Sequence, residues 1–327
     1  MDYARFQMDY SLIKGYRDES LERFLEQWSG DSDYITAHTS GSTGLPKEIC
    51  LLKSDMINSA LATCRFFDIG KGSRMANPLS VDYIAGKMMV VRALMSGSEL
   101  WIEKPSMMPL KGWESNELID LLPVVPAQIP GLIDSGRINC VKNIIIGGSK
   151  LDQNVEDILV ENKVSAYCTY GMTETCSHVA MRKIGQEAYR AMPGFRFSKD
   201  ERGCLVIKSS KMSFGRLVTN DVVDLESSTL FRWIGRFDNV INSGGIKLFP
   251  EQIESKIADL IIGRNFYISS RPSDTWGNEA ILLIEGLNLI NGLSEILSDR
   301  LTRYERPKAI IYKEHFRRTS SGKIIRE

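Results

Sequence analysis

Residues 141–170 read VKNIIIGGSKLDQNVEDILVENKVSAYCTY and hold the pattern that decides the fold. Residues 141–146 form a short β-branched run that stops at Gly147-Gly148, as a buried parallel strand does. Residues 152–162 have the composition and length of a helix, and residues 164–170 suit a second strand. A strand, a helix and a strand in this order predict a parallel β-α-β unit.

The N-terminal flank continues the alternation of helices and strands. Residues 18–28 have apolar side chains at helical spacing, and the mostly apolar residues 84–95 predict a buried helix. A further helix over 54–67 would have Ser54 as its N-cap and Asp55 in its first turn. The predicted fold class is therefore α/β, with a large N-terminal domain built on a mainly parallel sheet.

After residue 195 the pattern changes to short alternating runs separated by Gly, Asp and Ser, which indicate antiparallel strands. From Pro250 a helix is followed by expected strands at 265–271 and 280–285, a helix at 292–303 and a strand at 308–312. These elements form a small α+β unit of domain size. We expect two domains, over residues 1–237 and 238–327.

The composition is that of an ordinary globular protein. Of 327 residues, 43% are hydrophobic and 25% are charged, and 41 Lys and Arg balance 41 Asp and Glu. A chain without net charge is not expected to bind nucleic acid through bulk charge. The balance hides a basic tail, because residues 300–327 carry nine Lys or Arg against three acidic residues, a net charge of +6.

Targeting signals and cysteines point to a cytoplasmic protein. The N-terminal residues carry acids and no long apolar core, so no signal peptide is expected. No stretch approaches the ~18 consecutive apolar residues that a membrane span needs. The six cysteines form no C-x-x-C pair and are interpreted as reduced thiols.

Residues 39–47, TSGSTGLPK, have the chemistry of a phosphate-binding loop. Glycines let the backbone approach an anion, hydroxyl groups and N–H groups donate hydrogen bonds, and the lysine supplies charge. The spacing is not that of a Walker A loop. On composition alone, a flexible Ser/Gly turn is an equal alternative.

This loop resembles the TSGSTGxPK motif of the adenylate-forming acyl-CoA synthetase (AMP-binding) superfamily. Further motifs of that family follow in family order and extend the resemblance over residues 35–327. They are YGMTE at 170–174, TND at 219–221 with Asn in place of Gly, GRFD at 235–238, SGG at 243–245, P-E-x-x-E at 250–254 and RTSSGK at 318–323.

The resemblance implies an ATP-dependent acid–CoA ligase. A carboxylate would attack the α-phosphate of MgATP to give an acyl-AMP, and the thiol of coenzyme A would then displace AMP. The implied partners are ATP, Mg²⁺, coenzyme A as substrate and a small-molecule carboxylic acid, with the homo-oligomeric state left open. Three alternatives stay open: another aryl or aliphatic acid, a carrier protein in place of CoA, and a non-catalytic nucleotide-binding homologue.

The resemblance also implies roles for individual residues. Lys323, Thr173 and Glu174 would be catalytic, with Glu174 holding Mg²⁺. Asp238 would be the hinge of a mobile C-terminal domain, and Ser243, Gly244 and Gly245 would border the thiol channel. The implied ATP-binding positions are Thr39, Ser40, Gly41, Ser42, Thr43, Gly44, Lys47, Gly147, Gly148, Ser149, Tyr170, Gly171, Asp221 and Arg236.

The substrate segment is similar to that of short bacterial o-succinylbenzoate–CoA ligases of menaquinone biosynthesis. In those ligases an arginine at the spacing of Arg92 binds a carboxylate of the diacid, as a guanidinium fork suits. Tyr83 and Lys87 would lie in the same acid pocket. The alternative for Arg92 is a structural ion pair.

Each of the other sites also has a structural alternative. Thr173 and Glu174 could cap a helix, Asp221 could be a turn residue, and Arg236 with Asp238 could be a surface ion pair. Lys323 could belong to a frayed tail, and His178 is better explained as a structural histidine.

Two departures from the family pattern stand out. The segment before the phosphate loop is short, which suggests that one wall of the large domain is missing or supplied by a partner subunit, and Arg317 replaces the usual proline.

Overall fold

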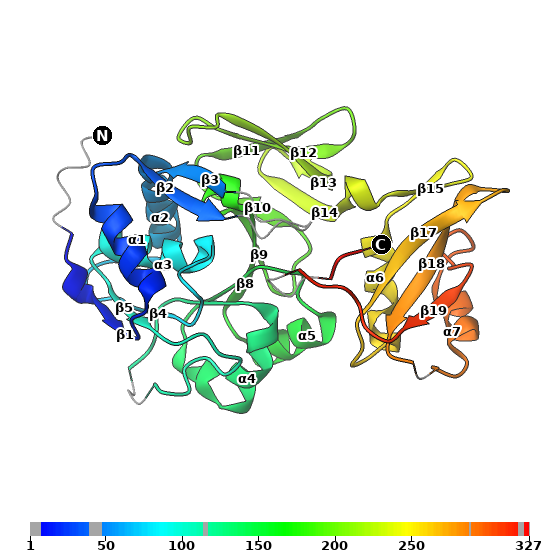
Figure 1. Cartoon of the computed structure of the whole chain (residues 1–327), viewed down its shortest axis with the longest axis horizontal. Helices are drawn as coiled ribbons and strands as arrows, with labels where there is room; N and C mark the ends of the chain where they lie inside the picture. The colour runs from blue at the N-terminus through cyan, green and yellow to red at the C-terminus, as the bar shows by residue number, and fades with distance from the viewer. Residues whose placement is uncertain (1–7, 39–47, 114–116, 288, 320–323, 327) are drawn as a thin grey trace. The chain divides into compact units, whose positions relative to one another are not determined.

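The computed structural model describes residues 8–38, 48–113, 117–287, 289–319 and 324–326 (Figure 1). The predicted β-α-β unit is present. Strand β7 (Ile144–Ile146) pairs in parallel with β8 (Ala166–Gly171), and helix α5 (Gln153–Glu161) connects them. Strand β6 (Leu122–Val124) pairs in parallel with the other edge of β7.

The same sheet continues with antiparallel strands. A short 3-10 turn (Thr173–Thr175) follows β8, so the chain returns directly as β9 (His178–Lys183), and β10 (Tyr189–Ala191) pairs antiparallel with β9. A return this short leaves no room for the helical crossover that a parallel strand requires. The strand order in this part of the sheet is β10-β9-β8-β7-β6.

A second parallel sheet has the order β1-β5-β4. Its strands are β1 (Ile13–Gly15), β5 (Glu99–Ile102) and β4 (Arg74–Asn77). Antiparallel strands β2 (Tyr34–His38) and β3 (Glu48–Leu52) form a separate pair. The associated helices are α1 (Glu19–Ser29), α2 (Lys53–Phe67), α3 (Ile84–Ser96) and α4 (Ile129–Asp134).

Helix α3 is buried along most of its length, as its apolar composition predicts, and packs against α2. The start of α2 differs from the prediction. The helix begins at Lys53 after Leu52, and Ser54 provides no side-chain cap. The carboxylate of Asp55 instead accepts hydrogen bonds from the backbone N–H and the hydroxyl of Ser213.

The contacts within the described chain define two compact units. The first holds the chain up to Arg196 together with Lys208–Gly215, and the second holds Phe197–Ile207 and the chain from Arg216 onward. Apolar residues of β4, β6, β7, β8 and α5 share one core within the first unit. The predicted domains, 1–237 and 238–327, stay a prediction.

The second unit begins with strands in the order β11-β12-β13-β14. These are β11 (Phe195–Lys199), β12 (Cys204–Ser209), β13 (Arg216–Ser227) and β14 (Leu230–Arg236), with β13 and β14 forming an antiparallel hairpin. A 3-10 turn (Phe237–Asn239) then leads to β15 (Ile241–Ser243) and β16 (Ile246–Leu248).

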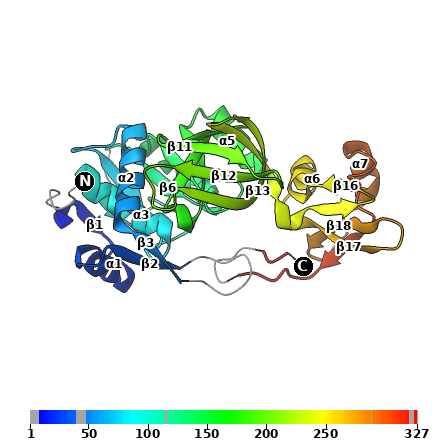
Figure 2. The ribbon, with the colours of Figure 1, turned by 90° about the horizontal axis from the view of Figure 1, so that it is seen from above.

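The rest of the second unit is a small α+β fold. Its strands β17 (Phe266–Ser273), β18 (Gly277–Glu285) and β19 (Ile310–Lys313) join β15 and β16, with β19 parallel to β18. Helices α6 (Pro250–Ile257) and α7 (Leu293–Arg300) cover one face of this sheet (Figure 2). Ala280, Leu282 and Ile284 of β18 share a core with apolar residues of these helices. On the other face, Ile281 and Leu283 pack with Phe316 and Ile324 of the C-terminal segment.

The five central residues of β18, Ala280–Ile284, thus alternate between two cores, because successive side chains of a strand point to opposite faces. Among the described residues, every helix is too short or too polar to cross a lipid bilayer.

Candidate functional site

Two segments that carry sequence motifs lie at the same edge of the first unit's sheet. Gly147-Gly148-Ser149 follows β7, and the YGMTE segment begins at the end of β8, the parallel neighbour of β7. Carboxyl ends of adjacent parallel strands form the usual ligand-binding edge of an α/β sheet. The structure therefore brings these two predicted nucleotide-binding segments together.

Glycine is required at this edge for steric reasons. A Cβ on Gly147 would lie 2.7 Å from the Thr169 hydroxyl oxygen, and Gly148 has a φ of +90°. A Cβ on Gly171 would lie 2.4 Å from the backbone oxygen of Ser177. The ring of Tyr170 meets that of Tyr189 edge-on, with the ring centroids 5.9 Å apart.

The helix-cap alternative for Thr173 and Glu174 does not hold. The turn is closed by Thr175, whose hydroxyl accepts from the backbone N–H of Met172 at 3.0 Å. Among the residues that the structure describes, the exposed carboxylate of Glu174 forms no ion pair. A single free carboxylate suits Mg²⁺ that arrives with phosphate oxygens and water as its other ligands, so Glu174 fits the predicted role.

Arg92 is a buried cation on α3 with only neutral partners. Its side chain is 2% exposed; Nη2 donates to the Ser177 hydroxyl at 2.6 Å, and Nη1 lies 3.3 Å from the sulfur of Met89. Nε has no hydrogen-bond partner among the described residues, and no carboxylate there pairs with the guanidinium. Burial lowers the pKa of Arg92 to about 10, so the group stays charged at pH 7. The ion-pair alternative therefore finds no support in the described part of the chain.

Among the described residues, no hydrogen bond joins the side chain of Lys87 or Tyr83 to Arg92. Lys87 is buried, donates to the backbone oxygen of Val81 at 2.7 Å and lies over the ring of Phe24 on α1, 5.3 Å from its centroid. Burial lowers the pKa of the Lys87 ammonium. Tyr83 is exposed at the N-cap of α3. The acid-pocket roles of both residues stay predictions.

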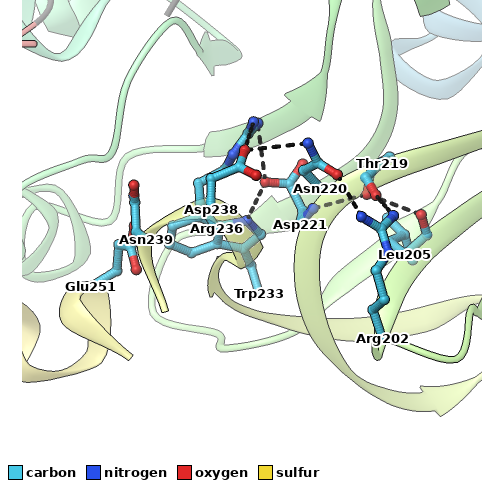
Figure 3. Close-up of polar contacts among 10 residues, drawn as sticks. All are labelled: Arg202, Leu205, Thr219, Asn220, Asp221, Trp233, Arg236, Asp238, Asn239 and Glu251. Atoms are coloured by element: carbon cyan, nitrogen blue, oxygen red, sulfur yellow. Dashed lines mark hydrogen bonds and ion pairs between the residues drawn. The ribbon is translucent and has the colours of Figure 1, made fainter. Parts of the chain in front are cut away.

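A polar cluster forms around the β13–β14 hairpin of the second unit (Figure 3). Asp221 and Arg236 are cross-strand partners, so the two predicted ribose-binding residues lie side by side. The Asp221 carboxylate is buried; its Oδ1 accepts from the indole N–H of Trp233 at 3.2 Å and lies 3.7 Å from Arg236 Nη1. Asp221 sits inside a strand, which removes the turn-residue alternative.

Asp238 occupies the 3-10 turn that follows this hairpin. Its Oδ2 accepts from Arg236 Nη2 at 3.3 Å and from Asn220 Nδ2 at 3.2 Å. The ion pair is exposed, so it contributes little stability by itself. Asn220, which replaces the family glycine, is in turn held by Arg202 Nη1 at 3.0 Å.

The SGG segment forms the turn between β15 and β16. Gly244 and Gly245 both have positive φ, +57° and +81°, as a two-residue hairpin turn requires. A Cβ on Gly244 would also lie 2.6 Å from the ring of Trp276. The backbone conformation of the turn, and at Gly244 the nearby Trp276 ring, thus explain why glycine stands at these two positions. The thiol-channel role stays a prediction.

Two predicted sites fall outside the described residues: the phosphate loop 39–47 and the catalytic Lys323. The residues that flank Lys323 are anchored. Arg318 Nη2 binds Glu285 Oε2 at 2.7 Å, and Arg326 binds both carboxylate oxygens of Glu254 at 2.7 Å. The backbone N–H of Ile325 donates to the oxygen of Arg317, which stands where the family has proline.

Sequence reasoning did not identify several polar residues of these sites. Ser177, Thr63 and Asn220 carry no motif by themselves, and each gains importance only through a partner distant in the sequence. His178 was assigned a structural role, and its ring nitrogens do contact hydroxyl groups of Thr63 and Ser177. Asn220 had one signal, the departure from the family's glycine.

Comparisons with known proteins agree with the family resemblance of the sequence motifs. The model of the family described as AMP-binding enzyme matches residues 13–201. The 2-succinylbenzoate–CoA ligase of Listeria monocytogenes is 24% identical, covering 95% of this chain and 72% of that protein. The long-chain-fatty-acid–CoA ligase FadD13 of Mycobacterium tuberculosis is also 24% identical, covering 97% and 71%.

Solved structures give the same result. An acyl-CoA synthetase (AMP-forming)/AMP-acid ligase II-like protein from Dyadobacter fermentans is 34% identical, with a TM-score of 0.65 over 95% of this chain and 93% of that chain. The o-succinylbenzoate coenzyme A synthetase of Bacillus subtilis, in complex with ATP and magnesium, has a TM-score of 0.78 at 18% identity, covering 89% and 68%. The predicted superfamily and fold class are thereby confirmed.

Proposed function

The chain belongs to the AMP-binding enzyme family, and on that premise we propose that it is an AMP-forming acid–CoA ligase whose acid is 2-succinylbenzoate. The observation that carries the choice of acid is Arg92. A buried guanidinium costs free energy unless a negative charge compensates it. The described residues offer it a hydroxyl and a thioether, and the second carboxylate of a diacid would supply the missing charge.

The proposed reaction has two steps, and neither needs a protein nucleophile. The acid's carboxylate oxygen attacks the α-phosphorus of ATP, and pyrophosphate leaves with the electrons of the broken P–O bond. The thiol sulfur of coenzyme A then attacks the acyl carbon, loses its proton, and AMP leaves. The protein contributes positioning and charge stabilisation.

The residues take the roles predicted for them. Glu174 would hold Mg²⁺, which neutralises phosphate charge when bound. Asp221 would accept hydrogen bonds from the ribose hydroxyls with Arg236 beside it, and Lys323 would stabilise charge at the α-phosphate during the first step. The glycines at the ends of β7 and β8 let the backbone of these two predicted nucleotide-binding segments pass close to Thr169 and Ser177.

A long-chain fatty acid is the competing substrate, because FadD13 has the same 24% identity to this chain as the Listeria succinylbenzoate ligase. Such an acid has one carboxylate, which reacts, and leaves Arg92 uncompensated. The two substrates thus make opposite demands on the buried guanidinium.

Pyrophosphate release with a panel of acids tests the proposal. The panel holds 2-succinylbenzoate, its two monoacids that each lack one carboxylate (4-oxo-4-phenylbutanoate and 2-butanoylbenzoate), and hexadecanoate. We expect 2-succinylbenzoate to have the highest kcat/KM, by about 100-fold or more, because a monoacid leaves a buried polar group unpaired. Faster turnover of hexadecanoate would reject the diacid. Mass spectrometry with and without coenzyme A identifies the thioester.

A further inference from the structure

A chain of hydrogen bonds leads from Arg92 through the first unit to helix α2. Arg92 Nη2 lies 2.6 Å from the Ser177 hydroxyl, which lies 3.3 Å from Nδ1 of His178. On the other side of the ring, Nε2 of His178 lies 3.1 Å from the hydroxyl of Thr63, and that hydroxyl donates to the backbone oxygen of Ser59. Thr63 and His178 are both buried.

The bond from the Thr63 hydroxyl to the backbone oxygen of Ser59 sets a direction for the other bonds in this chain. Thr63 uses its only hydrogen on Ser59, so it accepts from His178, and Nε2 carries the ring proton. Nδ1 is then an acceptor, and the Ser177 hydroxyl donates to it. This leaves the lone pairs of Ser177 facing Arg92, which can only donate.

A neutral histidine is essential to this arrangement. A protonated ring would present N–H to Ser177, turn its hydrogen toward the guanidinium and place two cations close together. Burial and the charge of Arg92 both lower the pKa of His178 well below its ordinary value. The electrostatics of the site therefore agree with the direction derived from the hydrogen bonds.

We propose that Ser177 and His178 are positioning residues that hold the Arg92 guanidinium as the receptor for the second carboxylate of the substrate. This inference rests on the proposed function. One Nη is fixed by Ser177, while Nε has no partner among the described residues. Because Ser177 and Met89 are neutral, they leave the positive charge of Arg92 to be compensated by a carboxylate. A guanidinium held in this way loses less rotamer entropy on binding than a loose arginine would.

Steady-state kinetics of matched variants test the role of Ser177. Ser177→Ala removes the acceptor, and we expect it to raise KM for 2-succinylbenzoate about tenfold, as loss of a hydrogen bond to a charged group does. The KM for ATP should stay within twofold of the wild-type value. So should kcat/KM for the reacting monoacid, which is whichever of the two monoacids retains the carboxylate that attacks ATP. Ser177→Thr, which keeps the hydroxyl, should retain most of the affinity for the diacid.

Ser96→Ala is the control, because the Ser96 hydroxyl also bonds Arg92 but reaches only its backbone oxygen, at 2.7 Å. It should leave KM for the diacid within twofold. Equal effects of Ser177→Ala on diacid and monoacid, or an unchanged KM for the diacid, would overturn the inference and leave Ser177 a merely structural residue.

Two substitutions of His178 separate its contacts. His178→Asn keeps an acceptor near the position of Nδ1 and should retain most of the diacid affinity, whereas His178→Phe keeps the ring and removes both nitrogens. We expect His178→Phe to reproduce the tenfold rise in KM. A full effect of His178→Asn together with none of His178→Phe would contradict the proposed bond directions.

Nitrogen-15 NMR gives a readout that does not depend on the substrate. The chain has three histidines, so the His178 signals can be assigned by their loss in His178→Asn. We expect the neutral, Nε2-protonated tautomer at pH 7, and a shift of the Arg92 guanidinium signals in His178→Phe. The other tautomer, or unmoved Arg92 signals, would overturn the positioning role. If the wild-type protein does not prefer the diacid, the proposed function fails, and these signals still decide whether His178 positions Arg92.

Discussion

The amide of Asn220 donates to the carboxylate of Asp238 across 3.2 Å, and this bond joins strand β13 to the turn Phe237–Asn239. Arg202 contacts both segments that this bond joins. It donates to Asn220 on β13, and its guanidinium lies over the ring of Phe237 in the turn, 5.1 Å from the ring centroid. The family's usual glycine at position 220 has no side chain to make such a bond. Asn220 therefore restrains Asp238, the residue that we propose as the hinge.

Asn220→Ala should loosen this turn without the backbone freedom that glycine would add. We expect the amide of Val240, which closes the turn on Phe237, to exchange its hydrogen about fivefold faster, since an exposed hydrogen bond contributes about 1 kcal/mol. Hydrogen exchange followed by mass spectrometry measures this, with Ser227→Ala at the far end of β13 as the control. Unchanged protection would show that Asn220 does not restrain the turn.

Glu156→Gln should destabilise the first unit in a pH-dependent way. Burial raises the pKa of Glu156, but hydrogen bonds from Arg182 and from the backbone N–H of Gly185 outweigh it and hold the pKa below its ordinary 4.5. The carboxylate therefore stabilises the fold above about pH 4.5, and this stability is lost as the pH falls through the lowered pKa.

At pH 7 the substitution breaks a buried ion pair, so we expect the free energy of unfolding to fall by about 3 kcal/mol. The difference from the wild type should shrink near pH 3. Urea unfolding at both pH values measures it, with the exposed neighbour Asp157→Asn as the matched control. A loss of equal size at both pH values would contradict the assigned titration.

Lys323→Ala should separate the two half-reactions. We expect acyl-AMP formation to fall by about 100-fold or more, since a charged contact in the transition state is lost, while thioester formation from supplied acyl-AMP should be affected far less. Quenched-flow measurement of each half checks this. Lys308→Ala, on the same basic tail, controls for charge alone. Equal losses in both halves would remove the assignment of Lys323.

The fold was largely predictable from the sequence because its signals are local. The strand at 141–146, the helix at 152–162 and the second strand at 164–170 correspond to β7, α5 and β8. Asp55 shows where local reasoning ends. Its place in a first helical turn suggested a charge for the helix end, and its carboxylate instead binds Ser213, which is 158 positions away in the sequence.

In the candidate site, too, local motifs were predictable from the sequence and long-range contacts were not. Motifs identified Asp221 and Arg236, and strand register explains why they meet. Arg92 was recognised by its resemblance to an arginine at the same spacing in succinylbenzoate ligases. Its burial and its link to Ser177, 85 positions away, depend on tertiary packing. Such tertiary partners leave no periodic pattern in one sequence.

Arg92→Met tests the central claim most directly, because methionine fills similar space without charge. The measurement is the ratio of kcat/KM for 2-succinylbenzoate to that for its reacting monoacid, in the wild type and in the variant. We predict that the ratio falls from about 100 or more to near one, while Tm stays level or rises because an uncompensated buried cation is gone. An unchanged ratio in a folded variant would contradict the account.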